Sequence, residues 1–268
     1  MTSATGIPDA AVIAEGVGED EPLLGRAGDA SQQEGRPLYY NLIIGKSAPN
    51  ARYPPLTFFS GTAVIAQAGL VLLVASIWAS IFLHPLILFS AHPLLNSAGI
   101  LALTESALLL QPTHTAAQKR QGTIAHFTLN NLGLALLVAG LIVIEYYKFS
   151  HNDTHFESPH SILGLITYIF LGIQALVGFT AYFVPNLYGS VETAKSMYKW
   201  HRLSGYVILT LMLATVTAAT QTDYNKNVLD IKIWAVLIAA VLVLIGVLPR
   251  IKKQKLGLKP KPSEALGQ

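Results

Sequence analysis

The sequence predicts an all-α integral membrane protein with six transmembrane helices. Hydrophobic residues make up 52% of the 268 residues and charged residues only 12%, whereas soluble domains carry about 25% charged residues. The few charges are also unevenly placed, because they gather at the two ends of the chain and in short connections. Between these connections lie long apolar runs, several of which reach the roughly 20 residues that a helix needs to cross a bilayer.

Composition divides the chain into three segments. Residues 1–55 begin as an acidic stretch without an apolar signal-peptide core and continue as a proline-containing stretch. Such a segment buries too little apolar surface to offset its ordering entropy, so we expect its first part to be disordered and the rest to be extended. Residues 56–249 form the expected membrane domain, and residues 250–268 form a basic tail.

The first three spans are each bounded by a break in the apolar pattern. The first run covers about residues 56–83 and stops at His84-Pro85, and the second covers about 86–110 and stops at Gln111-Pro112. The third covers about 124–147, after a polar connection. Proline lacks a backbone N–H and disfavours helix at the residue before it, so it marks the ends of the first two runs.

The last three spans are also predicted from long apolar runs. The fourth covers about 161–183 and stops before Pro185, the fifth covers about 203–219, and the sixth covers about 231–248 and is halted by Pro249. Because the connections are short, consecutive helices should pack as antiparallel neighbours. We expect helices 2–5 to form a central four-helix bundle.

Lysine and arginine are more frequent on one side of the predicted topology, and this bias predicts that both termini are cytosolic. The basic residues of the predicted cytosolic flanks are Arg36, Lys46, Arg52, Lys119, Arg120, Lys195, Lys199, Arg202, Arg250, Lys252, Lys253, Lys255, Lys259 and Lys261. The opposite connections contain only Lys148, Lys226 and Lys232. The basic tail is interpreted either as a surface for anionic lipid or as a solvated flank.

Four of the eight histidines lie near the starts of predicted spans 2–5: His92, His126, His160 and His201. Consecutive helices run in opposite directions, so these residues are expected to form two pairs at two depths. His92 and His160 should lie on the non-cytosolic side, and His126 and His201 on the cytosolic side. Ionisable residues in spans are rare and indicate functional sites.

Two imidazoles from alternate helices can bind a haem iron from both sides. Such an iron has no open position for a substrate and passes single electrons. The pattern therefore predicts electron transfer across the membrane. The alternatives are a haem-free scaffold and a histidine-lined metal or proton transporter. The absence of cysteine excludes iron–sulfur clusters and thiolate zinc sites.

The other titratable residues of the spans and loops are interpreted more simply. His84 lies at a helix break, and His114, His151 and His155 are expected to be solvated loop residues. Glu105 is interpreted as a residue near the cytosolic interface, with a second role in haem or proton handling left open.

Several short motifs carry a resemblance to a known family. They are His92-Pro93, Thr104-Glu105-Ser106-Ala107-Leu108-Leu109, Lys119-Arg120, Ser158-Pro159-His160-Ser161 and His201-Arg202-Leu203-Ser204-Gly205-Tyr206. With them, roughly residues 56–250 resemble the cytochrome b561 family, and most closely its short, domain-containing branch of animals and fungi. The resemblance implies two b-type haems, each held by two histidines of the central bundle.

The resemblance also implies donors and acceptors. A cytosolic reductant such as ascorbate would supply the His126–His201 haem, and the His92–His160 haem would reduce monodehydroascorbate or a ferric chelate on the other side. Lys119 and Arg120 correspond to residues that receive the anionic reductant, unless they only set the topology, and His151 loosely matches a substrate contact. Gln111-Pro112-Thr113-His114 replaces a longer arginine-rich motif, which puts ascorbate itself in doubt.

Three further expectations complete this interpretation. One alternative within the same chemistry is a haem-bearing membrane anchor that exchanges electrons with a quinone or a partner protein. The predicted location is an endomembrane, such as the endoplasmic reticulum, a vesicle or the vacuole, in preference to the plasma membrane. A homodimer is expected from the resemblance alone, and no nucleic-acid partner is expected.

Overall fold

The computed structural model describes residue 38 and residues 62–111, 113, 116–251 and 256. The expectations for the acidic N-terminal segment, for His114 and for most of the basic tail lie outside these residues. Within them the chain is helical, without strands, and six helices are long and apolar enough to cross a membrane. The structure therefore confirms the predicted all-α fold class with six candidate spans.

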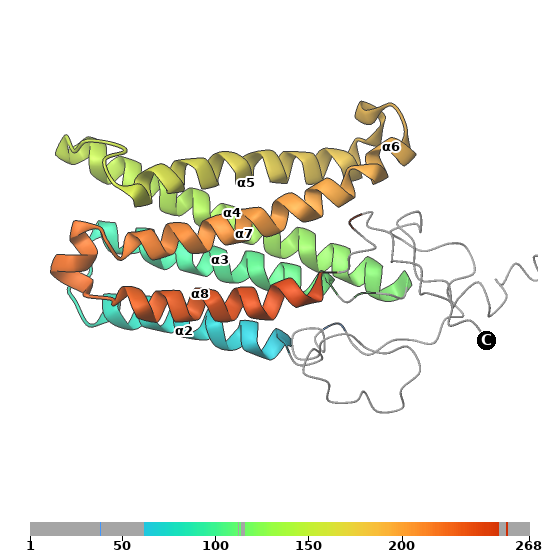
Figure 1. Cartoon of the computed structure of the whole chain (residues 1–268). Coiled ribbons are helices and arrows are strands. Elements are labelled where there is room, and N and C mark those ends of the chain that lie inside the picture. The colour runs from blue at the N-terminus through green and yellow to red at the C-terminus, as the bar shows by residue number, and fades with distance from the viewer. Residues whose placement is uncertain (1–37, 39–61, 112, 114–115, 252–255, 257–268) are drawn as a thin grey trace, which may run out of the picture.

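Each candidate span is built around one long helix, and shorter helices complete the connections (Figure 1). The long helices are α2 (Thr62–Phe82), α3 (Ala91–Leu110), α4 (Ala116–His151), α5 (Pro159–Phe183), α7 (Tyr198–Ala219) and α8 (Ile233–Val247). The short ones are the 3₁₀ turns η3 (Leu88–Ser90), η4 (Pro185–Tyr188) and η6 (Leu248–Arg250), the helix α6 (Val191–Ser196) and the π turn η5 (Asn225–Leu229).

Two helices begin at least one full turn earlier than their apolar runs. The sequence predicts a start at about residue 124 for the third span, but α4 begins at Ala116. The added residues include alanine, glutamine, lysine and arginine, which are good helix formers. His126 therefore lies about three turns into α4 and not in its first turn, although it remains in the N-terminal third of the helix. The helix α7 likewise begins at Tyr198, before the predicted residue 203.

The start of α5 follows directly from its sequence. The Ser158 hydroxyl accepts a hydrogen bond from the backbone N–H of Ser161, and the backbone N–H of Ser158 donates to the Ser161 hydroxyl. Pro159 is the first helical residue, where its missing N–H costs nothing. This reciprocal cap places His160 in the first turn of α5.

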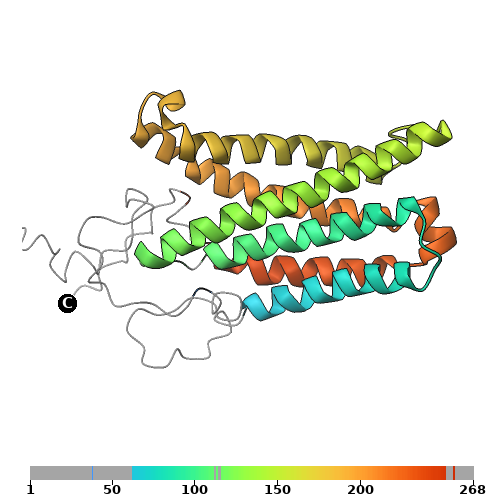
Figure 2. The same cartoon turned by 180° about the vertical axis from the view of Figure 1, so that it is seen from behind.

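The six long helices lie roughly along a common direction and pack mainly in three pairs (Figures 1 and 2). The helix α3 packs along α4, α5 along α7, and α2 along α8, and further contacts join α2 to α3 and α7 to α8. In Figure 2, α4 runs obliquely from α3 at one end towards α5 at the other. The α3–α4 pair and the α5–α7 pair carry the four predicted histidines.

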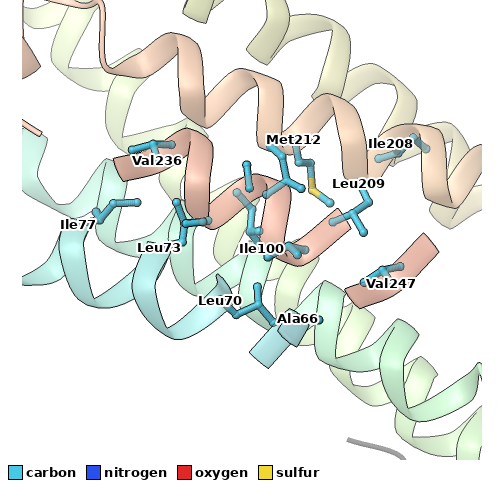
Figure 3. Packing of buried hydrophobic residues seen from close by; sticks show 14 of the residues in the cluster. Ala66, Leu70, Leu73, Ile77, Ile100, Ile208, Leu209, Met212, Val236 and Val247 are labelled. Atoms are coloured by element: carbon cyan, nitrogen blue, oxygen red, sulfur yellow. The ribbon is translucent and has the colours of Figure 1, made fainter. Parts of the chain in front are cut away.

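The best-buried apolar residues come mainly from α2, α3, α7 and α8 (Figure 3). By contrast, only 17% of the residues in the apolar stretch of α4 and 11% of those in the apolar stretch of α5 are buried. At the α2–α8 contact, a Cβ on Gly246 would lie 2.4 Å from the backbone nitrogen of Ala66 and 2.6 Å from the carbonyl oxygen of Thr62. The absence of a side chain at Gly246 therefore sets how closely α2 and α8 approach.

Replacing Gly246 by alanine should destabilise the fold without acting on the histidines. The new methyl group meets backbone atoms, which cannot rotate away, so α2 and α8 must separate. Overpacking of this kind costs about 1–3 kcal/mol. The apparent melting temperature in detergent should fall relative to wild type. The matched control is Gly172→Ala, since a Cβ on Gly172 meets nothing within 4 Å; equal melting temperatures for the two variants would contradict this account of the α2–α8 contact.

Candidate functional site

The four predicted histidines form two facing pairs. The ring centroids of His92 on α3 and His160 on α5 are 6.1 Å apart, and their ring planes are inclined by 85°. The ring centroids of His126 on α4 and His201 on α7 are 6.4 Å apart, with planes inclined by 80°. Each pair thus joins one helix of the α3–α4 pair to one helix of the α5–α7 pair.

The two pairs lie at different depths. Ser106 contacts His126 and lies fourteen residues after His92 on the same helix, which corresponds to about 21 Å along the axis. Thr215 contacts His160 and lies fourteen residues after His201 on α7, which again corresponds to about 21 Å. This separation is about two thirds of the roughly 30 Å thickness of a hydrocarbon core.

Three of the four imidazoles are oriented by a hydrogen bond at Nδ1. The Nδ1 atom of His92 lies 2.9 Å from the carbonyl oxygen of Gly140, and that of His160 lies 2.9 Å from the carbonyl oxygen of Thr215. A carbonyl oxygen only accepts, so in both rings Nδ1 carries the hydrogen and donates it. The Nδ1 atom of His126 lies 2.7 Å from the Ser106 hydroxyl. In His92 and His160 the lone pair is then on Nε2.

The fourth imidazole is positioned by packing. Nδ1 of His201 is buried and has no hydrogen-bond partner among the described residues. Its ring lies against Gly178 of α5, where a Cβ would be 2.7 Å from the Cε1 atom of His201. Gly178 therefore provides the space that the His201 ring occupies.

For three of the four histidines, the residue four positions later on the same helix also contributes to the site. Asn96 donates through Nδ2 to the carbonyl oxygen of His92 at 2.8 Å, and Asn130 donates to that of His126 at 2.6 Å. At His201 this donor is Gln174 of α5, at 2.7 Å, and Gly205 leaves room for it, because a Cβ there would lie 3.2 Å from the Gln174 amide nitrogen. Sequence reasoning missed these residues, although the repeated spacing of histidine and asparagine was visible.

The donor set and spacing fit a haem at each pair. Metal–imidazole bonds of about 2 Å on both sides, plus about 1 Å from each Nε2 to its ring centroid, place two axial rings roughly 6 Å apart. The observed separations are 6.1 and 6.4 Å. The described residues contain no cluster of three or more histidine, aspartate or glutamate side chains able to hold a metal ion.

The predicted substrate residues lie at the two ends of α4. Lys119 and Arg120 lie in its early turns, but Lys119 is 8% exposed, whereas Arg120 is exposed. His151 is exposed at the other end and stacks on Tyr147, with ring centroids 4.2 Å apart. Phe89 contacts both Tyr147 and His92, so aromatic rings lie between His151 and the His92–His160 pair.

Two further titratable residues make contacts that the sequence did not indicate. His155 lies in the connection between α4 and α5, as predicted, but its side chain is only 26% exposed and its Nε2 lies 3.0 Å from a Glu145 carboxylate oxygen. Glu105 accepts a 2.7 Å hydrogen bond from Gln67 of α2. Glu105 therefore joins α3 to α2, and no described contact links it to the histidines.

A cluster at the end of the bundle was also missed. Arg250 is 5% exposed and donates to the Gln111 side chain at 3.1 Å and to the carbonyl oxygen of Leu108 at 2.9 Å. Gln111 in turn donates to the Tyr206 hydroxyl at 3.2 Å. The end of α8 is thereby tied to α3 and α7.

Comparison with known proteins identifies a family model and several relatives. The model described as eukaryotic cytochrome b561 matches residues 91–229. An ascorbate-specific transmembrane electron transporter of Zea mays is 27% identical over 61% of this chain and 70% of its own length. A transmembrane ascorbate-dependent reductase of Homo sapiens is 28% identical over 47% and 50%. A lysosomal membrane ascorbate-dependent ferrireductase of Mus musculus is 27% identical over 48% and 54%.

Proposed function

Since the chain belongs to the cytochrome b561 family, we propose that it transfers electrons across a membrane through two b-type haems. His92 and His160 hold one haem, and His126 and His201 hold the other. Within this family, we propose that the chain belongs to the short, domain-containing branch. The membrane is an endomembrane with both termini of the chain in the cytosol.

One observation carries this proposal. Two pairs of facing imidazoles lie at two depths, about 21 Å apart along the helices. A haem with two imidazole ligands supplies one-electron chemistry and has no open position for a substrate. The protein's own part is to fix each imidazole, through Gly140, Thr215, Ser106 and Gly178, so that little rearrangement accompanies electron transfer.

The cytosolic donor is a small anionic reductant such as ascorbate. Its oxidation by one electron releases a proton and leaves monodehydroascorbate on the cytosolic side. Arg120 is exposed near the start of α4 and presents positive charge to the reductant, and the buried Lys119 adds to the local potential. Names of the relatives from Zea mays and Homo sapiens, which both specify ascorbate, support this assignment.

The non-cytosolic acceptor is monodehydroascorbate, which takes up one electron and one proton, or ferric ion, which becomes ferrous. His151 is exposed at that end of α4 and connects to His92 through Tyr147 and Phe89. The name of the relative from Mus musculus, a ferrireductase, supports a ferric acceptor.

A vesicle assay tests the function. Purified protein is reconstituted into liposomes loaded with ascorbate, and a ferric chelate is added outside. We expect ferrous ion to appear outside only in vesicles that contain the protein. The control is protein-containing vesicles without ascorbate. Ferrous ion formation at the same rate in protein-free, ascorbate-loaded vesicles would contradict the proposed transfer.

Arg120→Ala should weaken the use of ascorbate in this assay. Removing one exposed positive charge lowers the local concentration of an anionic donor, so the apparent KM for ascorbate should rise several-fold, more at low than at high ionic strength. Haem content should not change. The matched control is Lys232→Ala, which removes an exposed positive charge from the opposite side. An equal rise of KM in both variants would show that the effect is not local to α4.

A further inference from the structure

Two polar side chains lie inside the bundle between the two histidine pairs. Asn96 is one turn after His92 on α3, and Tyr168 is two turns after His160 on α5. The Tyr168 hydroxyl lies 2.7 Å from the Oδ1 atom of Asn96 and 2.8 Å from the carbonyl oxygen of Leu137 on α4. One hydroxyl group thus connects α5 to both α3 and α4. Polar groups inside spans are costly unless paired, so such a network indicates a role.

The same network reaches His92. The Asn96 amide nitrogen donates to the carbonyl oxygen of His92 at 2.8 Å. It also packs against Gly140, where a Cβ would lie only 2.3 Å from it. The carbonyl oxygen of Gly140 accepts the Nδ1–H of His92. Asn96 therefore contacts both partners of the hydrogen bond that orients the His92 ring, and Tyr168 holds Asn96 in place.

We propose that Asn96 and Tyr168 are positioning residues that hold His92 against the Gly140 carbonyl and so keep the redox potential of the His92–His160 haem low. This inference rests on the proposed function, because it requires a haem at that pair. A hydrogen bond donated from Nδ1 makes the imidazole a stronger electron donor to a metal. That donation stabilises oxidised iron, and weakening the bond raises the potential.

The other pair is built differently, which makes the effect specific to one haem. The Nδ1 atom of His126 contacts the Ser106 hydroxyl, which also accepts a hydrogen bond from Asn130 at 2.6 Å. Nδ1 of His201 has no partner among the described residues. No described contact connects Tyr168 to this pair, so changes at Tyr168 act only on the His92–His160 haem.

A redox titration followed by absorbance tests the proposal on the intact, haem-loaded protein. In Tyr168→Phe and in Asn96→Leu, two haems per chain should remain and one of the two potentials should rise. We expect a change of up to about tenfold in the reduction equilibrium, which is about 59 mV for one electron, with the larger change for Asn96→Leu. The matched control is Tyr182→Phe, the same change on the same helix, next to Phe183; its titration should equal that of wild type.

A third variant identifies which of the two haems has the changed redox potential. Ser106→Ala removes the hydrogen-bond partner of His126 Nδ1 and should shift the other potential. The proposal is overturned if Tyr168→Phe leaves both potentials unchanged, or if it moves the potential that Ser106→Ala moves. A wild-type protein without haem would overturn the proposed function and this inference together. Two haems with potentials that Tyr168→Phe does not shift would overturn this inference alone.

Discussion

Replacing His126 by alanine is expected to reduce the haem content from two per chain to one and to abolish electron transfer across the membrane. The ring centroids of His126 and His201 are 6.4 Å apart, so the loss of His126 would leave only one histidine to hold the cytosolic haem. Loss of a haem from one of two sites in series interrupts the whole path. Haem content is measured by the pyridine haemochrome method and transfer by the vesicle assay.

Double variants make this prediction sharper. If the pairing is correct, both substitutions of the double variant His126→Ala with His201→Ala affect the same haem site. This double variant should therefore still contain one haem per chain. His92→Ala with His126→Ala affects both pairs and should leave none. The matched control is His84→Ala, because Nδ1 of His84 contacts the carbonyl oxygen of Ser80 at a helix end. A chain that keeps both haems after His126→Ala would contradict the assignment.

Replacing Gly178 by alanine, which adds one methyl group, is expected to have the second large effect on haem binding. The new Cβ would lie 2.7 Å from Cε1 of His201 and 3.4 Å from its Nε2. The ring must therefore move away from its present position beside His126. The cytosolic haem should be lost or strongly weakened, with one haem per chain remaining, as in His201→Ala.

Gly172→Ala is the matched control for this experiment. It lies on the same helix, and a Cβ there meets nothing within 4 Å. This variant should keep two haems per chain and the wild-type absorption spectrum. If Gly178→Ala also kept both haems with unchanged potentials, the close packing of Gly178 against His201 would have no role in haem binding.

The histidine pairs could be predicted from the sequence because two simple regularities fix them. Apolar runs of bilayer length give the number of spans, and antiparallel neighbours place alternate helices in the same direction. His92 and His160 therefore had to be near one surface. The boundary of α4 was missed, because residues before the apolar run are good helix formers and extend the helix beyond it.

The groups that orient the histidines were harder to predict. His92 and His160 donate to backbone carbonyl oxygens of Gly140 and Thr215, and a carbonyl group has no signature in the sequence. Which faces of neighbouring helices contact one another depends on side-chain packing, and the sequence alone does not specify it. The closeness of Gly178 to His201 likewise depends on how α5 crosses α7. The positions of Asn96 and Asn130, each four residues after a histidine, were visible in the sequence, but their meaning became clear only from the contacts.

The central claim is that this chain holds two haems between four histidines, and the absorption spectrum of the purified protein tests it most directly. Ascorbate should reduce the protein to a spectrum of low-spin b-type haem, and the pyridine haemochrome assay should give two haems per chain. A folded, helical preparation that is colourless when expressed with sufficient haem, or that binds haem equally well without these four histidines, would contradict the claim.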